Sequence, residues 1–176
     1  YHVIAAAELQ RLIRRTIFAT DVESTRYALG GVLFEMGTDT ITLVGTDGRR
    51  LAHAEGAVEA EGEISAATAS PVVPVKALKL IERNLDASDP PVHLSFQGNT
   101  AVLIRTEQAV IHSRLVEGRF PRYQDVFPST VEVKIPLEVG PLRAAIEQSA
   151  IVTNEESRGV DFSFEEGVLK LTSQTA

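Results

Sequence analysis

The feature that most constrains this chain of 176 residues is an internal repeat. A helical stretch followed by three strand-like stretches occurs over residues 5–60 and again over 72–118, and a third copy begins near residue 131. Two copies also share sequence after the helix, since "ATDVEST" before "GVLF" corresponds to "VTNEES" before "RGVDF". One such unit cannot bury its own apolar face, so the copies must pack together. The expected class is therefore α+β, with repeated β-α-β-β-β units and helices on one face of antiparallel sheets.

Two stretches have the apolar period of a helix. The first, residues 5–20, places Leu9, Leu12, Ile13 and Ile17 on one side. The second follows a short strand within residues 72–85, and its apolar side consists of Ala77, Leu78, Ile81 and Leu85. Both helices are therefore expected to pack one face against a sheet.

Strand-like stretches rich in Val, Leu, Ile and Thr follow each helix, separated by turn residues. They cover residues 30–37, 40–45 and 49–60 after the first helix, and 91–98, 100–107 and 109–118 after the second. Each set of three is predicted to form an antiparallel meander. The stretch 55–70 also contains a segment expected to be a mobile, solvated loop.

The repeats predict two domains. Residues 1–128 hold two units, and residues 129–176 hold the first half of a sister domain. The junction "GRFPRYQDVFPST" contains proline and aromatic residues, which favour a fixed connection over a flexible linker. Because the chain opens with Tyr1 and stops just after a strand-like run, we expect it to be a piece of a longer protein, whose severed half-domain exposes an unpaired strand edge and permits non-native dimers.

Basic residues gather on the polar side of both complete helices. The first helix carries Arg11, Arg14 and Arg15, and the second carries Lys76, Lys79 and Arg83, although the net charge of the chain is −7. Helices lying side by side would form a basic lining that could face phosphates without reading bases. The alternative is an ordinary solvated surface. The third helix adds no support, because it has Arg143 with Glu147 one turn later.

Catalytic and metal-binding patterns are absent from the sequence. His2, His53, His93 and His112 fall on four different predicted strands without ligand spacing. No phosphate-binding glycine loop, dinucleotide fingerprint or nucleophile elbow occurs. The acidic residues Glu55, Glu59, Glu61 and Glu63 lie in a loop-like stretch without regular spacing. We therefore predict no cofactor, no metal and no catalytic residues.

The cellular setting follows from other absences. The chain has no cysteine, so it can form neither disulfides nor thiolate metal sites. No apolar run is long enough to span a membrane, and no signal peptide opens the chain. We expect a cytoplasmic protein.

The stretch "VGTDGRRLA", residues 44–52, is predicted to form a hairpin. Asp47-Gly48 between two strand-like runs is a strong hairpin signal, typical of type I′ turns. Arg49, Arg50 and Leu51 would emerge at its rim, and such a mixed apolar and cationic surface suits a peptide.

Four motifs together resemble one family: "LGGVLFE", "TLVGTDGRRLA", "GRFPRYQDVFP" and "NEESRGV", in this order and spacing. They are similar to the bacterial beta sliding clamps, the processivity factors of DNA polymerase III. The resemblance covers essentially the whole chain, as the middle domain and the first half of the last one. It implies the DNA clamp fold and a full-length homodimer ring, with helices lining a hole for duplex DNA and sheets outside.

The resemblance also implies two sets of site residues. The partner-peptide pocket would consist of Leu29, Thr46, Gly48, Arg49, Arg50, Leu51, Pro121 and Val126. The DNA-facing residues would be Arg11, Arg14, Arg15, Tyr27, Lys76, Lys79 and Arg83. Two positions depart from the family's pattern: Arg49 stands where His is frequent, and Asp125 where a basic residue is common. The family's first domain and the carboxy-terminal tail that completes the pocket are absent.

The implied function is that of a non-enzymatic clamp that encircles duplex DNA without sequence preference. Its partners would be replicative and other DNA polymerases, the clamp loader and repair proteins, each captured through a short linear motif. One alternative is a peptide-binding scaffold that does not contact DNA. Another is an enzyme using carboxylates such as Asp47 and Glu55.

Overall fold

The structure, a computed structural model, describes residues 1–23, 28–61, 71–151, 153 and 159–173. It divides into two compact units, Tyr1–Phe127 and Pro128–Ala176, which are considered separately. None of the helices in the described part of the chain is long and apolar enough to cross a membrane.

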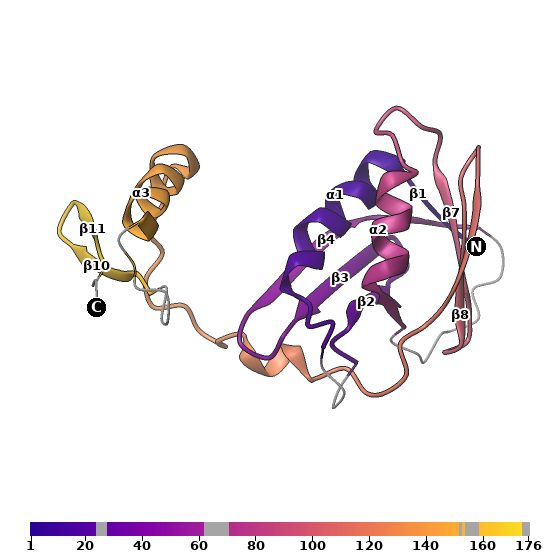
Figure 1. The fold of residues 1–176 in the computed structure, drawn as a ribbon, viewed down its shortest axis with the longest axis horizontal. Helices are drawn as coiled ribbons and strands as arrows, with labels where there is room; N and C mark the ends of the chain where they lie inside the picture. The colour runs from indigo at the N-terminus through magenta and orange to yellow at the C-terminus, as the bar shows by residue number, and fades with distance from the viewer. Residues whose placement is uncertain (24–27, 62–70, 152, 154–158, 174–176) are drawn as a thin grey trace. The chain divides into compact units, whose positions relative to one another are not determined.

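The first unit contains two antiparallel sheets (Figure 1). One has the strand order β5-β1-β7-β8-β9 and the other β4-β3-β2-β6. The strands are β1 (His2–Ile4), β2 (Gly31–Met36), β3 (Thr40–Thr46), β4 (Leu51–Ala57), β5 (Glu59–Ala60), β6 (Val72–Pro74), β7 (Val92–Gln97), β8 (Ala101–Arg105) and β9 (Val110–Arg114). Both predicted meanders, β2-β3-β4 and β7-β8-β9, are confirmed.

The two repeats exchange their first strands. β1 precedes the first helix, yet it pairs with β7 of the second repeat. β6 precedes the second helix, yet it pairs with β2 of the first repeat. Each sheet is therefore completed by the other repeat, which gives a physical reason why one copy does not suffice.

The two helices are α1 (Ala6–Thr16), extended by a 3₁₀ turn at Ile17–Ala19, and α2 (Val75–Arg83). They lie side by side over the sheets (Figure 1). The Nε2 of Gln10 donates a 2.9 Å hydrogen bond to the carbonyl of Leu85, just beyond α2. The side chains of Leu12 and Leu78 are fully buried in the main core between helices and sheets. The predicted apolar helix faces are thus confirmed, although Ile17 lies beyond α1.

The third predicted strand, residues 49–60, is wrong in its extent. β4 ends at Ala57, and the chain then crosses to the other sheet, where β5 pairs with β1. Val58 is buried at this crossing, and its N–H donates to the carbonyl of Asp39 at 3.0 Å. The acidic residues Glu55 and Glu59 therefore lie on strands rather than in a loop. Glu63 and most of the expected loop lie outside the described residues.

The second unit contains α3 (Val139–Ile151) and the hairpin of β10 (Asp161–Glu165) and β11 (Val168–Thr172). Residues 131–138, which begin the third copy, form no strand. The first unit supplies the reason, because a leading strand pairs with the neighbouring repeat and not with its own. No residue of α3 is buried.

A segment that we call the connector, residues 116–127, crosses the face of the β4-β3-β2-β6 sheet opposite the helices. Side chains alternate along β2, so that Val32 and Phe34 enter the main core while Leu33 faces the other way. A second apolar cluster covers that other face, and Phe120 and Tyr123 of the connector are buried in it. The connector is therefore fixed by packing.

Candidate functional surfaces

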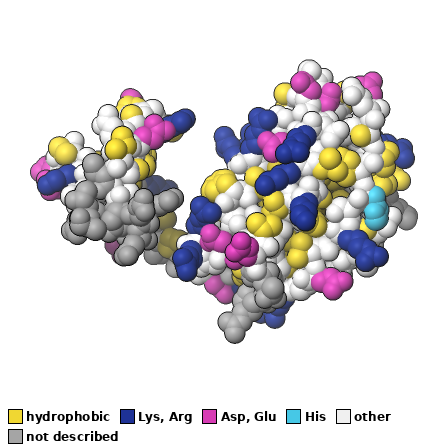
Figure 2. Space-filling view, viewed as in Figure 1, with side chains coloured by type: hydrophobic (Ala, Val, Ile, Leu, Met, Phe, Trp, Pro, Cys, Tyr) yellow, Lys and Arg dark blue, Asp and Glu magenta, His cyan; other side chains and the backbone are white. Residues whose placement is uncertain are grey.

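The polar faces of α1 and α2 carry the predicted DNA-facing residues. Arg14, Arg15, Lys76, Lys79 and Arg83 are exposed, and Arg11 is half-buried. Figure 2 shows Lys and Arg side chains gathered over the two helices. The structure thus brings six of the seven residues to one face of the first unit. Tyr27, the seventh, lies outside the described residues.

Two of these arginines are paired with carboxylates. Arg11 donates bidentately to Glu8, at 2.7 Å and 2.5 Å, and its Nη2 also reaches the carbonyl of Glu55 at 2.8 Å. The guanidinium of Arg11 holds the pKa of Glu8 below its usual value, chiefly through the hydrogen bond between the two side chains. Arg14 of α1 donates to Glu82 of α2 at 2.7 Å. Their charges are therefore partly offset, and the exposed cations at Arg15, Lys76, Lys79 and Arg83 supply most of the positive field.

The predicted hairpin is confirmed, but its loop is longer than a type I′ turn. Thr46 pairs with Leu51 across β3 and β4, which leaves four residues, 47–50, in the loop. Gly48 has a φ of +86°, a backbone conformation that favours glycine. A type I′ turn would leave only two residues between the paired strands.

Side-chain hydrogen bonds hold this loop. Asp47 Oδ1 accepts from the N–H groups of Arg49 and Arg50, each at 2.9 Å, and Oδ2 accepts from Arg50 Nε at 3.0 Å. The hydroxyl of Thr46 donates to the carbonyl of Arg50 at 2.7 Å and accepts from Gly48 N–H at 3.1 Å. The hydrogen bonds that Asp47 accepts from Arg49 and Arg50 lower its pKa, and the bond from the N–H of Arg49 is the largest cause. The carboxylate of Asp47 therefore orders a turn. A carboxylate that already accepts these hydrogen bonds and has a lowered pKa is a weak proton acceptor and does not suit a general base.

Most of the predicted pocket residues lie on or beside the hairpin. The hairpin groups Thr46, Gly48, Arg49, Arg50 and Leu51 within six positions. Leu51 is half-buried and packs against the second apolar cluster. This cluster contains Phe120 and Tyr123, the connector residues on either side of Pro121 and Arg122. This packing brings the hairpin next to the connector.

Leu29 and Val126 stand at opposite extremes of exposure. Leu29 is only 6% exposed and therefore has little surface to offer a ligand, whereas Val126 is 65% exposed. Asp125, the departure from the family's pattern, is also exposed and precedes Val126 in a 3₁₀ turn, Tyr123–Val126.

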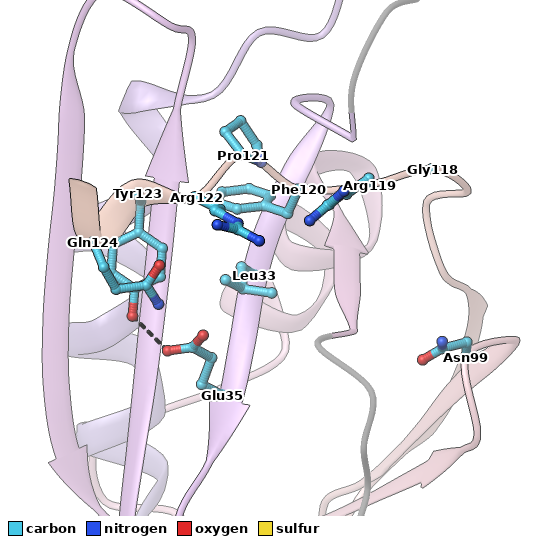
Figure 3. A pocket seen from close by; sticks show the side chains of 10 residues that line it. All are labelled: Leu33, Glu35, Asn99, Gly118, Arg119, Phe120, Pro121, Arg122, Tyr123 and Gln124. Atoms are coloured by element: carbon cyan, nitrogen blue, oxygen red, sulfur yellow. Dashed lines mark hydrogen bonds between the residues drawn. The ribbon is translucent and has the colours of Figure 1, made fainter. Parts of the chain in front are cut away.

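A cavity of about 380 Å³ lies beneath the connector (Figure 3). Connector residues 118–124 form one wall, Leu33 and Glu35 of β2 form the floor, and Asn99 of the β7–β8 turn lies at the far side. Of the predicted peptide-pocket residues, Pro121 lines this cavity. The hydroxyl of Tyr123 donates a 2.5 Å hydrogen bond to Oε2 of Glu35.

Apart from Pro121, the residues of this cavity are not among the predicted site residues. The sequence indicates part of this site, because Leu33 and Glu35 alternate with the apolar Val32 and Phe34 along one strand. Alternate residues of a strand face opposite sides of the sheet, so Leu33 and Glu35 share the second face. Which segment covers that face is a long-range choice, and only the packing of Phe120 and Tyr123 reveals it.

The structure also places the four histidines. They lie on β1, β4, β7 and β9, four different strands as predicted. His53 packs against the rings of Tyr123 and Phe127, with ring centroids 6.0 Å and 5.8 Å away. Among the described residues, no group of three or more His, Asp or Glu side chains is arranged to hold a metal ion.

Comparison with known proteins identifies the family. Residues 3–122 match the model of the DNA polymerase III beta subunit, central domain. The chain is 32% identical over 166 residues to the beta sliding clamp of Chlamydia muridarum, covering 94% of this chain and 44% of that protein. It is 34% identical over 173 residues to the beta sliding clamp of Vibrio cholerae, covering 97% and 45%.

Solved structures agree with the sequence comparison. A DnaN sliding clamp of Pseudomonas aeruginosa, crystallised with griselimycin, superposes with a TM-score of 0.83 at 31% identity, covering 99% of this chain and 47% of that one. The chain thus spans less than half the length of the relatives that it matches. With the family model covering most of the first unit, the chain belongs to the family of bacterial DNA polymerase III beta subunits, the beta sliding clamps, and it has their clamp fold.

Proposed function

We propose that this chain forms part of a processivity clamp, which encircles duplex DNA as a homodimeric ring and tethers polymerases, the clamp loader and repair proteins. In this proposal residues 1–128 are the middle domain of the clamp, and residues 129–176 are the first half of its carboxy-terminal domain. The ring acts in the cytoplasm and needs no catalytic group, because retention on DNA is topological.

The observation that carries the proposal is the distribution of charge about the first unit. Exposed Arg15, Lys76, Lys79 and Arg83 share the helix face of a chain whose net charge is −7. Cations on smooth helix faces attract phosphates without entering a groove, so contact with DNA is loose and independent of sequence. A sliding ring requires such contact.

The peptide-binding surface in this proposal is the hairpin together with the connector. Leu51 and Pro121 are half-buried and offer apolar surface, while Gly48 lacks a side chain that would hold a peptide backbone away. The hydrogen bonds from Asp47 and Thr46 keep the hairpin in one conformation, so little ordering is needed when a peptide binds. Val126 supplies a further exposed apolar contact.

Two observations favour the alternative, a peptide-binding scaffold that does not contact DNA. Arg11 and Arg14 are already paired with Glu8 and Glu82, which reduces the positive charge of the helix face. Arg14, Arg15 and Arg83 also lie in the last turns of their helices, where basic residues favourably meet the helix dipole. In this alternative Arg14, Arg15 and Arg83 stabilise their helices and do not meet DNA.

Charge reversal distinguishes the two functions. In a protein of the relatives' full length that carries this sequence, Arg15, Lys79 and Arg83 are each changed to Glu. The clamp proposal predicts loss of processive synthesis by the cognate polymerase, because the helix face then repels phosphates. A matched variant reverses Arg105, Arg114 and Lys134, which are exposed and belong to neither α1 nor α2. Unchanged processivity in the first variant, with its fold intact, would support the scaffold.

A further inference from the structure

The cavity beneath the connector has chemistry that the proposed function does not use. Arg119 and Arg122 both line it, and both are exposed. In Figure 3 their side chains converge over Leu33 of β2. Within the described part of the chain, neither guanidinium has an ion-pair partner, in contrast to Arg11, Arg14 and Arg50. We call this site the arginine cavity.

Paired guanidinium groups recognise carboxylate and phosphate oxygens, because their planar N–H forks donate two parallel hydrogen bonds. The amide side chains of Asn99 and Gln124, which also line the cavity, add neutral donors and acceptors. Among the described residues that line the cavity, Glu35 is the one acidic residue, and Tyr123 donates to it. With two arginines and one glutamate among these described residues, the arginine cavity has a surplus of one positive charge and suits an anionic group.

The position of the arginine cavity decides which anion it meets. Leu33 and Glu35 lie on the sheet face opposite the helices, since their neighbours Val32 and Phe34 enter the core beneath α1 and α2. Duplex DNA in the proposed clamp lies on the helix side. A phosphate of that duplex is therefore not the natural ligand of the cavity. The natural ligand is an anionic group on a protein partner.

Pro121 joins the arginine cavity to the proposed peptide surface. It lines the cavity, and it also belongs to the predicted peptide pocket. Its neighbours Phe120 and Tyr123 are buried in the cluster against which Leu51 packs. A peptide seated on Leu51 and Pro121 therefore lies beside the cavity, and an extended chain advances only about 3.3 Å per residue. We therefore expect an acidic residue one or two positions from the apolar motif to reach the arginines.

We propose that the arginine cavity binds an aspartate or glutamate side chain that flanks the apolar motif of a partner peptide. The inference rests on the proposed function, since it assumes that the partner is held at Leu51 and Pro121. The cavity would then select among partners: those with an acidic flank bind more tightly than those with the apolar motif alone.

A set of blocked peptides tests this selection. The parent peptide has the Gln-x-x-Leu-Phe pattern, and it is extended by Glu-Glu at either end or, as a control, by Gln-Gln at the same ends. Affinity for the chain is measured by fluorescence anisotropy, and the side-chain Nε–Hε signals of Arg119 and Arg122 are followed by NMR. We expect one Glu-Glu extension to raise affinity about fivefold or more, because charge-assisted hydrogen bonds form in a partly open site.

Matched variants locate the gain. The double variant R119Q/R122Q should lose the effect of Glu-Glu while still binding the parent peptide. The double variant R105Q/R114Q, which removes two exposed arginines elsewhere, should keep it. An equal gain from Gln-Gln, or a gain that survives in R119Q/R122Q, would overturn the proposal.

Failure of the proposed function has a different signature. If the parent peptide leaves the amides of Gly48 and Leu51 unshifted, the peptide surface is wrong, and acetyl-Glu-Glu amide alone then tests the cavity. If that compound shifts the Arg119 and Arg122 signals, the cavity binds carboxylates as proposed. If it shifts neither signal, the proposal is overturned. Shifts produced by a short DNA strand but not by the glutamate compound would assign the cavity to nucleic acid instead.

Discussion

The phenol of Tyr123 donates a 2.5 Å hydrogen bond to Oε2 of Glu35, a residue 88 positions earlier in the chain. The bond joins the connector to β2, at the margin of the second apolar cluster. Burial is the largest cause that raises the pKa of Tyr123, to about 12, and the hydrogen bond with Glu35 follows. One phenol therefore helps to hold the segment that carries Arg119, Pro121 and Arg122.

Tyr123→Phe should lower the free energy of unfolding of the first unit by about 1–2 kcal/mol, because Glu35 loses its donor in a partly buried site. Urea denaturation measures the change. The matched variant is Tyr1→Phe, since Tyr1 is 62% exposed and loss of its hydroxyl should change stability little. Equal stability of Tyr123→Phe and the parent chain would show that the bond does not hold the connector.

The raised pKa of Tyr123 predicts a loss of stability in alkaline solution. An unfolded tyrosine titrates near a pKa of about 10. The folded chain keeps the proton up to a pKa of about 12, so the extra stability is fully present below pH 10 and disappears as the pH rises toward 12. Unfolding free energies across this range should fall more steeply for the parent than for Tyr123→Phe. Parallel profiles would contradict the assignment.

Gly45→Ala should destabilise the first unit by about 1–3 kcal/mol or more, because a methyl group there would clash with the backbone carbonyl of Thr16 at the end of α1. Thermal unfolding followed by circular dichroism measures the loss. Gly140→Ala in α3 is the matched control, since no neighbouring atom lies near an added Cβ there. A Gly45→Ala chain as stable as the parent would mean that α1 does not lie this close to β3.

Glu82→Gln should strengthen binding of duplex DNA severalfold at low salt, because it releases Arg14 from its 2.7 Å pair and adds one net positive charge to the helix face. Filter binding across a salt series measures both affinity and salt slope. Glu107→Gln, at an exposed residue of the turn after β8, changes the net charge equally and should have a smaller effect. Equal effects of the two variants would mean that the helix face does not meet DNA.

Much of the fold could be predicted because its signals are local. The helical period of Leu9, Leu12 and Ile13, and the Asp47-Gly48 turn between apolar runs, act within a few residues. The exchange of β1 and β6 between repeats could not be predicted, because either meander offers an edge to a short apolar strand. Strand pairing at such distances depends on the whole packed unit.

The candidate site shows the same division. Arg11, Arg14 and Arg15 are assigned to one helix face by period alone, and the structure keeps them there. Their ion pairs could be predicted only in part: Glu8 is three residues from Arg11, whereas Glu82 is 68 residues from Arg14 and meets it because α1 and α2 lie together. The arginine cavity is likewise formed by segments distant in sequence.

In the proposed clamp, the first unit presents its helix face to the phosphates of DNA and its hairpin to partner peptides. The most direct test is NMR titration of the chain with a Gln-x-x-Leu-Phe peptide, and separately with a short duplex at low salt. The peptide should shift the amides of Gly48, Arg49 and Leu51, with no response in Leu51→Lys, and the duplex should shift those of Arg15, Lys76 and Lys79. Both ligands should bind at once. Competition between them, or shifts of one common set of residues, would contradict the account.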